Sequence, residues 1–421
     1  MYDFAIIGGG IAGLTTAEIF SRSGYKVILI EKNSKICSES SGLHHEWFHF
    51  GSLYSIFPNK NSLRILVGGI DDLLLYYRDF KNMNLKIDHK GKIKVLEKKN
   101  SWFKNNNFNY LFRKKNMSPL WKKKFKSFCN VHKNFEEYDW RKGEASKYIP
   151  NVKNKKETRI KIKRLNGKKF FKVKSFDCPM ESTLIANDIL ESFLNYNGKL
   201  KKNCEIKKIS KSKEFYTLLD KEKKKIHSKK VIFANGSGIN KFTKSKVVKS
   251  FLSPLIITYP NLCKENYIIM SDNKKRAVNH VLHKKNNKKY SILGGGDYVE
   301  KLNHKNNDLA MLSRNLKKLA IENFGNLENL KTHTYFGVKN EVIKEDKRNY
   351  IYTIKKIKDD FYYINPGKFS LSFSLAINTF KKIVGHYPNP TIDIKKKLED
   401  SKKLLRGNYH KNFVFKKFLK N

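Results

Sequence analysis

The strongest structural signal in the chain is FAIIGGGIAG, residues 4–13. It begins with a short apolar run typical of a buried strand and continues into glycines with the spacing G-x-G-x-x-G. A helical stretch follows over residues 14–23, and a second apolar run, residues 26–30, closes on Glu31. Strand, glycine turn, helix and strand together predict a complete βαβ unit at the start of the chain.

Each glycine of this turn has a mechanical task. Gly8 permits a tight turn, Gly10 lets the backbone approach a diphosphate, and Gly13 lets the helix pack closely on the strand. The unpaired N–H groups and the dipole of the helix start favour phosphate groups. Glu31 can accept hydrogen bonds from ribose hydroxyls. The unit therefore predicts a bound dinucleotide, and a glycine-rich turn without a ligand is the alternative.

The segment after Glu31 indicates which dinucleotide is bound. A nicotinamide-dependent dehydrogenase would normally continue into further βα repeats, whereas residues 37–54, CSESSGLHHEWFHFGSLY, have the composition of a long loop. With this loop the chain resembles the D-amino-acid-oxidase-like (DAO) FAD-dependent oxidoreductases, which include glycine, sarcosine and 2-hydroxyglutarate oxidases. The loop of that family ends in His-x-Gly-x-x-Tyr, matched here by His49, Gly51 and Tyr54. Where the family usually has a small residue shortly before the histidine, this chain has Glu46.

Two later segments are similar to the places where that family returns to its cofactor domain. Residues 182–238 predict a helix, a strand, a hairpin and a strand that ends in an Ala-x-Gly turn. Residues 361–376 predict a strand that passes through Pro-Gly into a helix, whose free N–H groups stabilise negative charge on a reduced flavin. An ordinary strand-to-loop turn and a simple βα turn are the alternatives at these two places.

The resemblance implies an α/β fold in which a Rossmann-like FAD-binding domain of the glutathione-reductase type carries a discontinuous α+β substrate domain on an antiparallel or mixed sheet. The expected domains are residues 1–84, 176–242 and 336–388 for FAD, residues 85–175 and 243–335 for the substrate, and residues 389–421 as a basic C-terminal tail, either an amphipathic helix or a loose end. The residues that it places against FAD are Gly8, Gly10, Ile11, Ala12, Gly13, Glu31, Lys32, Ser41, Gly42, His49, Ile206, Ala234, Gly236, Gly367, Lys368, Phe369, Ser370 and Leu371.

The chemistry that the resemblance implies is oxidation of a C–N or C–O bond in a small polar metabolite by hydride transfer to flavin N5. Oxygen or an unidentified acceptor would then take the electrons. The candidate catalytic residues are His49, which can orient the substrate or take a proton, together with Tyr335 and Lys339. His49 as a packing residue, or as a covalent attachment point for the flavin, stays open. The family often has Gly-x-Arg where Lys339 stands, and lysine lacks the two-point fork that grips a carboxylate.

A second glycine cluster, SILGGG at residues 291–296, imitates a dinucleotide motif. Val299 stands where the third glycine should be, and no helix followed by an acid comes after it. A separate nicotinamide site is therefore not expected, which leaves an oxidase or an acceptor-linked dehydrogenase.

The chain carries 88 basic and 38 acidic residues, a net charge of +50, which suggests a polyanionic partner at first sight. Only 11 of the basic residues are arginine, and the abundance of Lys, Asn, Ile, Phe and Tyr fits A/T-rich codons better than selection for reading bases. Residues 101–128 interleave aromatic rings with lysines, as a stacking surface for nucleic acid would, although a half-buried helix or strand is the preferred interpretation. A small-molecule substrate is therefore expected, with no specific nucleic-acid partner. An oxidoreductase of the same architecture acting on a tRNA base, and a flavin-binding protein without turnover, remain alternatives.

Five scattered cysteines without a C-x-x-C pair give no sign of a zinc site or a disulfide scaffold. The first residues contain no basic leader, and no uncharged apolar run approaches the ~18 residues of a membrane span. A cytosolic location without a transmembrane segment, and no bound metal, are therefore the expectations.

Overall fold

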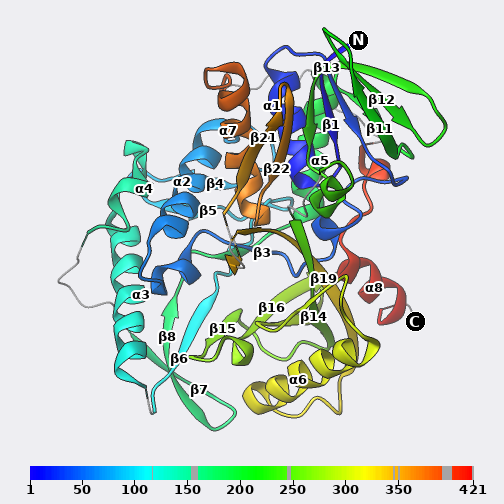
Figure 1. Cartoon of the computed structure of the whole chain (residues 1–421). Coiled ribbons are helices and arrows are strands. Elements are labelled where there is room, and N and C mark those ends of the chain that lie inside the picture. The colour runs from blue at the N-terminus through cyan, green and yellow to red at the C-terminus, as the bar shows by residue number, and fades with distance from the viewer. Residues whose placement is uncertain are drawn as a thin grey trace.

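The structure is a computed structural model that describes residues 1–115, 117–152, 160–243, 248–344, 347–348, 351–390 and 401–419. Two large sheets organise the chain, with the first in the upper half of Figure 1 and the second in the lower half. The helices are α1 (Ile11–Arg22), α2 (Asn61–Tyr76), α3 (Pro119–Glu137), α4 (Ala145–Tyr148), α5 (Ser182–Asn195), α6 (Asn306–Phe324), α7 (Ser372–Val384) and α8 (Tyr409–Lys417).

The first sheet has a parallel centre, with antiparallel strands added at one side. Its parallel strands, each paired with the next, are β10 (Lys199–Lys201), β2 (Val27–Ile30), β1 (Tyr2–Ile7), β13 (Lys225–Phe233) and β22 (Phe361–Asn365). The added strands are β12 (Tyr216–Asp220) on β13, β11 (Ile206–Lys211) on β12, and β21 (Thr353–Lys358) on β22. Because parallel strands end at the same edge, the residues that follow β1, β2, β13 and β22 gather there.

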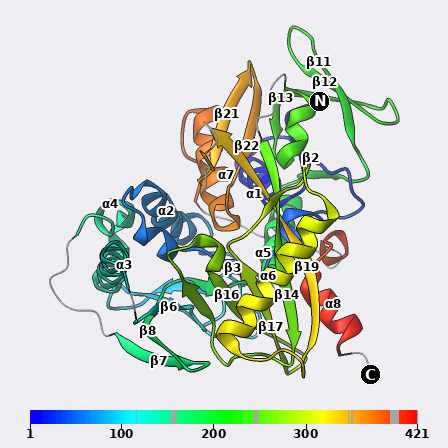
Figure 2. The same cartoon turned by 60° about the horizontal axis from the view of Figure 1, so that its bottom comes forward.

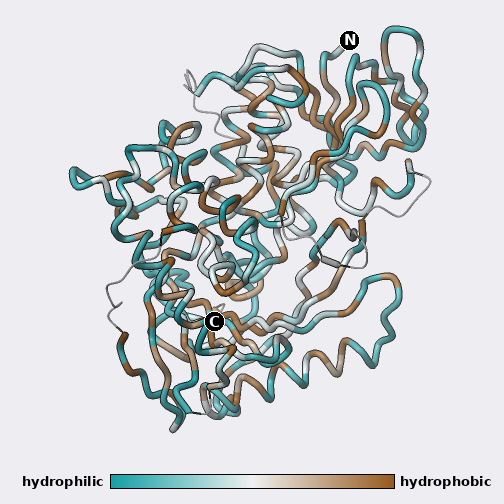
Figure 3. The backbone as a smooth tube through the Cα atoms, turned by 60° about the vertical axis from the view of Figure 1, so that its left-hand side comes forward, coloured by the Kyte–Doolittle hydropathy of each residue, from teal (hydrophilic) through white to brown (hydrophobic). Residues whose placement is uncertain are grey.

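Helix α1 is the crossover between β1 and β2, and all of its twelve residues are buried. It packs against α5 and α7, so it has no face toward solvent, and its sequence is accordingly apolar or small almost all round. Hydrophobic residues are concentrated on this sheet and on the helices that cover it (Figure 3). The predicted Rossmann-like half is therefore present.

The second sheet is mixed, with β15 and β6 parallel and its other neighbours antiparallel. Its order is β20 (Lys347–Arg348), β19 (Lys331–Lys344), β14 (Val248–Tyr259), β17 (Lys288–Gly295), β16 (Val278–Lys285), β15 (Tyr267–Met270), β6 (Asn109–Arg113), β8 (Lys168–Lys174) and β7 (Lys161–Leu165), with β18 (Val299–Glu300) beside β14. Small pairs elsewhere are β3 (Trp47–Phe48) with β9 (Cys178–Pro179), and β4 (Leu85–Ile87) with β5 (Ile93–Val95). The predicted α/β class with a second mixed sheet is thus confirmed. The domain boundaries stay a prediction, and β19 runs continuously across the one placed between residues 335 and 336.

The aromatic rings of residues 101–128 belong to the interior. Trp102, Phe103, Tyr110 and Phe112 are at most 1% exposed, and Trp121 of α3 packs in the same cluster as Tyr110 and Phe112. These rings therefore belong to the hydrophobic core.

Helix α6 lies within residues 243–335 of the expected substrate domain, where the sequence analysis named no helix. The helix lies across the second sheet (Figure 2), and its buried residues Leu312, Leu316, Ala320 and Asn323 recur at helical spacing. Apolar residues such as Met311 and Ile321 also lie on the exposed side of the helix, so the buried stripe is poorly marked in the sequence.

The C-terminal segment folds back onto the molecule. Val414 of α8 is buried against Leu255 and Ile257 of β14, and the ring of Phe413 stacks on His333 with centroids 3.8 Å apart. Of the two alternatives for the tail, the helix is the one found for residues 409–417. Within the described ranges, no helix combines the length and the apolar character that a bilayer span requires.

Neighbouring carboxyls on α2 make stability depend on pH. Burial raises the pKa of Asp71 to about 7 and that of Asp72 to about 6, and the Asp72 charge adds to the shift at Asp71. An aspartate in the unfolded chain titrates near 3.9, so the folded state holds the Asp71 proton from about pH 4 to 7 and loses stability as pH rises through that window. We expect Asp71→Asn to raise the free energy of unfolding at pH 8 by about 1–2 kcal/mol. Urea titrations at pH 8 and pH 4 measure this, and an equal gain at both pH values would contradict it.

Candidate functional site

A cavity of about 500 Å³ opens at the carboxyl edge of the parallel strands. Gly8 and Gly10 line it after β1, Glu31 after β2, Ala234 to Gly236 after β13, and Pro366 to Phe369 after β22. This edge is where open α/β sheets bind their ligands, because helix N-termini and exposed backbone N–H groups meet there.

The three glycines of the turn have different roles in the structure. Gly8 has φ 117°, and a Cβ atom there would lie 2.7 Å from the backbone of Ala234. A Cβ atom on Gly13 would lie 1.9 Å from the carbonyl oxygen of Gly8. Gly10 differs from both, because within the described part of the chain a Cβ atom there would meet only the Ser41 Oγ, at 3.2 Å. Gly8 and Gly13 therefore serve the fold, and Gly10 keeps room for a ligand.

Polar groups surround the glycine turn. The backbone N–H of Ile11, the first residue of α1, donates to Ser41 Oγ at 3.0 Å. The Glu31 carboxylate accepts from the N–H of Gly9 and from the backbone and side chain of Asn33, each at 2.8 Å, so its position at the cavity wall is fixed. A helix N-terminus, an open Gly10 and a fixed acid are the groups that a dinucleotide with a diphosphate requires. The residues present therefore fit FAD.

Fourteen of the residues expected at FAD line this cavity, as does the candidate catalytic residue Lys339. They are Gly8, Gly10, Ile11, Ala12, Glu31, Lys32, Ser41, His49, Ile206, Ala234, Gly236, Gly367, Lys368 and Phe369. Their contact with FAD itself stays a prediction.

Five expected site residues do not line the cavity: Gly13, Gly42, Ser370, Leu371 and Tyr335. Gly13 and Gly42 serve backbone packing, since a Cβ atom on Gly42 would lie 2.6 Å from the Cys37 carbonyl oxygen. Tyr335 is buried with residues of β14 and α8. It shares the strand face of Lys339 but precedes it by four residues, which is about 13 Å along a strand.

One end of the cavity gathers two histidines and two lysines. His45 and His49 line it together with Lys339 and Lys368, and both histidines have a buried ring nitrogen without a hydrogen-bond partner among the residues that the structure describes. Burial holds the pKa of His45 and of His49 well below the usual value, and the charges of Lys339 and Lys368 lower both further. The two rings are therefore neutral near pH 7 and can accept a proton.

Asp177 fixes the chain on both sides of His49, and the sequence interpretation did not identify it. Its Oδ2 accepts from Trp47 Nε1 at 3.1 Å and from the Tyr110 hydroxyl at 2.8 Å, while its Oδ1 accepts from the N–H of Phe50 at 2.8 Å. The Trp47 ring lies against His49, with centroids 3.9 Å apart. Burial raises the pKa of Asp177, and these donors oppose the shift. An acid before Cys-Pro gives no sequence signal for such a role.

Asn340 is a second residue that the sequence interpretation missed. It lines the cavity from β19, donates from Nδ2 to Ser40 Oγ at 2.9 Å, and accepts from Ser250 Oγ at 2.5 Å. It thereby ties the loop that carries Ser41 to the second sheet. Its position one residue after Lys339 is the only signal that the sequence offers.

Comparisons with known proteins agree with this geometry. A family model described as "FAD dependent oxidoreductase" (DAO) matches residues 3–151. Phytoene desaturase of Cercospora nicotianae is 29% identical over 92 residues, which is 22% of this chain and only 13% of that protein.

Solved structures resemble the whole chain. L-proline dehydrogenase of P. horikoshii is 16% identical with a TM-score of 0.61, covering 92% of this chain and 94% of the other. L-α-glycerophosphate oxidase of Mycoplasma pneumoniae, solved with FAD bound, is 14% identical with a TM-score of 0.63 over 94% and 98%. Glycine oxidase of Geobacillus kaustophilus is 12% identical with a TM-score of 0.62 over 94% and 97%.

The family model and the solved structures named above thus make this chain similar to FAD-dependent oxidoreductases, and the residues around its glycine turn fit FAD. Within that class, the match over residues 3–151 confirms the predicted resemblance to the D-amino-acid-oxidase-like family.

Proposed function

We propose that the chain oxidises a C–N or C–O bond of a small polar metabolite that carries an anionic group, such as an amino acid or a hydroxy acid. The observation that supports this most is the gathering of Lys339, Lys368, His45 and His49 at one end of the cavity. FAD, when bound, supplies the hydride acceptor, at N5 of the flavin, so the protein has to hold the substrate and take one proton.

Each of these residues has a role in the proposal. The ammonium groups of Lys339 and Lys368 hold a carboxylate or phosphate by charge, as point charges without the geometry of an arginine fork. The neutral ring of His49, or of His45, accepts the proton of the substrate amine or hydroxyl. The similar structures include enzymes named for proline, glycine and glycerophosphate, each of which carries a carboxylate or a phosphate.

The deciding experiment is anaerobic mixing of the yellow protein with matched donors, followed by the visible absorbance of the flavin. An amino acid or hydroxy acid should bleach the flavin, and the corresponding amide, which lacks the charge, should not. Equal bleaching by the acid and by its amide would show that the site does not recognise the anionic group of the substrate. A flavin that no amine or hydroxy acid bleaches would favour a flavin-binding protein without turnover. Return of the colour in air would identify oxygen as the acceptor.

Lys339→Met is expected to raise KM for the bleaching donor by about 10–100-fold, with a smaller change in kcat. The lost contact is made to the substrate both before and during the reaction, so its loss mainly weakens binding. Each tenfold rise in KM corresponds to about 1.4 kcal/mol. Lys331→Met is the matched control, because Lys331 lies on the same strand, carries the same charge and is exposed. A lower kcat at unchanged KM would contradict the role given to Lys339.

A further inference from the structure

Glu46 is a buried carboxylate beside the cavity, in a place where related loops have a small residue. Its side chain is 0% exposed, and its backbone has φ 59°, a left-handed conformation that is unusual outside glycine. Strain of this kind persists where the surroundings hold it, and it concentrates at functional sites. The two residues before it, His44 and His45, line the cavity directly.

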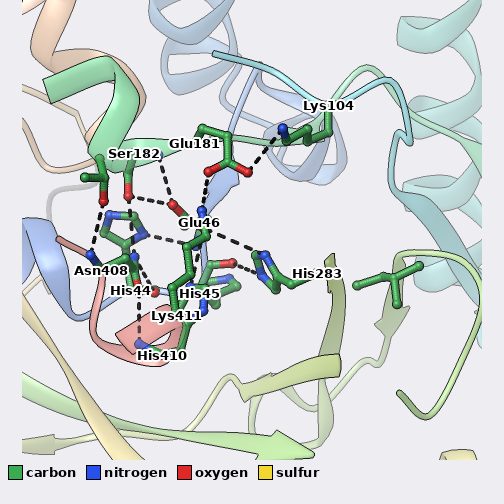
Figure 4. Close-up of polar contacts among 12 residues, drawn as sticks. His44, His45, Glu46, Lys104, Glu181, Ser182, His283, Asn408, His410 and Lys411 are labelled. Atoms are coloured by element: carbon green, nitrogen blue, oxygen red, sulfur yellow. Dashed lines mark hydrogen bonds and ion pairs between the residues drawn. The ribbon is translucent and has the colours of Figure 1, made fainter. Parts of the chain in front are cut away.

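Glu46 connects three segments of the chain (Figure 4). Its Oε1 accepts from the backbone N–H and the hydroxyl of Ser182, at 2.9 and 2.7 Å, which ties it to the start of α5. Its own N–H donates to His44 Nδ1 at 3.0 Å, and its carbonyl accepts from the Met180 N–H at 2.9 Å. Its Oε2 lies 2.7 Å from the ammonium group of Lys411 on α8. The position of this loop therefore depends on where Glu46 is held.

Lys411 is the cation that balances this carboxylate. It also pairs with Glu181 Oε2, while Lys104 lies 3.2 Å from the other oxygen of Glu181, so two acids face two lysines. Burial alone would lower the pKa of Lys411, but the charges of Glu46 and Glu181 outweigh it and the pKa is raised. Lys411 is therefore an ammonium at neutral pH, and the cluster is electrically balanced.

A divalent metal is the rival occupant of this cluster. His410 Nε2 lies 3.5 Å and His283 Nδ1 lies 3.7 Å from Glu46 Oε2, and the three side chains form a possible ligand set. A metal would have to sit about 2 Å from the same oxygen that Lys411 contacts at 2.7 Å. Two cations would then stand a few ångströms apart in a buried site, where repulsion is strong. Lys411 already occupies the place of the cation.

The segment that carries Lys411 also holds the other end of the loop. Ile36 forms a parallel bridge with Leu405, its N–H donates to the Leu404 carbonyl at 3.0 Å, and its carbonyl accepts from the Arg406 N–H at 3.2 Å. Residues 404–411 thus contact both ends of residues 36–46, a segment that we call the cofactor loop. The cofactor loop includes Ser41, which accepts a hydrogen bond from the first N–H of α1, and the cavity residues His44 and His45.

We propose that Lys411 is a positioning residue that sets the affinity for FAD by holding the cofactor loop through Glu46. The C-terminal helix α8 is then part of the cofactor site without touching the cavity. This inference rests on FAD as the cofactor and is independent of the proposed substrate.

The test uses the full chain and measures FAD affinity, the visible flavin spectrum and the midpoint of thermal unfolding. Lys411→Met should weaken FAD binding by about tenfold or more, the size typical when a partner that orients a binding group is lost. Lys411→Arg, which keeps the charge, should restore affinity to within about threefold of the unchanged chain. Lys416→Met, on the exposed face of the same helix, should change neither affinity nor spectrum.

A double variant separates positioning from general damage. If Lys411 acts through Glu46, Lys411→Met should add little further loss of affinity to Glu46→Gln, and this pair remains informative if Lys411→Met alone fails to fold. Losses that add in full would overturn the proposal, as would unchanged FAD affinity and spectrum in Lys411→Met. One tightly bound divalent metal per purified chain, lost in a His410→Ala variant, would also overturn it, because Lys411 would then not be the cation of the cluster.

Discussion

Gly10→Val should abolish FAD binding while the chain stays folded. The backbone of Gly10 is extended, with φ −75° and ψ 176°, so a β-branched residue is tolerated there. The nearest described atom to its Cβ position is the flexible Ser41 hydroxyl, at 3.2 Å, and Gly10 itself lines the cavity. The valine side chain would stand where the backbone has to approach the diphosphate. We expect affinity to fall by more than about 100-fold, equivalent to about 3 kcal/mol.

The measurement is FAD titration of the refolded or FAD-depleted chain, followed by flavin fluorescence, with circular dichroism as the check on folding. Gly13→Ala is the informative contrast, because a Cβ atom 1.9 Å from the Gly8 carbonyl oxygen forces the turn apart. That variant should lose folding stability together with cofactor. A yellow Gly10→Val protein with normal affinity would mean that the diphosphate does not lie on this turn.

Asp177→Asn should cost about 3 kcal/mol or more of folding free energy, although the two side chains have nearly the same volume. The Asp177 carboxylate accepts from Trp47, Phe50 and Tyr110 at once. An amide presents an NH₂ group to at least one of these donors, and a buried donor left without an acceptor costs about 1–3 kcal/mol, more where a charge took part. The loop around His49 should loosen as a result.

Urea titration with tryptophan fluorescence measures this loss, since Trp47 itself reports on the site. Asp272→Asn makes the same change of charge at an exposed residue and should stay within about 0.5 kcal/mol of the unchanged chain. If Asp177→Asn also changed the free energy of unfolding by no more than about 0.5 kcal/mol, the carboxylate would not be what holds the loop.

The first βαβ unit could be predicted because its contacts are local. The positive φ of Gly8, the close packing of Gly13 on the Gly8 carbonyl, and the place of Glu31 at the end of β2 follow from turn geometry and strand direction within about thirty residues. The buried residues of α2, such as Leu63, Leu66 and Ile70, likewise recur at helical spacing, which is a local pattern. The cofactor class followed from this unit together with the loop after it.

The rest of the site depends on contacts between distant segments, which no local pattern encodes. Tyr335 and Lys339 were equally good catalytic candidates in the sequence. Of the two, Lys339 lines the cavity and Tyr335 does not, because the register of β19 against β14 sets which residue lies there. Asp177, Asn340 and Lys411 act on a loop that lies far from each of them in the chain. The amino-acid sequence alone was enough to predict the glycine turn and the kind of cofactor expected there. The side chains that surround the turn could not be predicted in this way, because long-range strand pairing, burial and charge balance arise when distant segments come together in the folded chain.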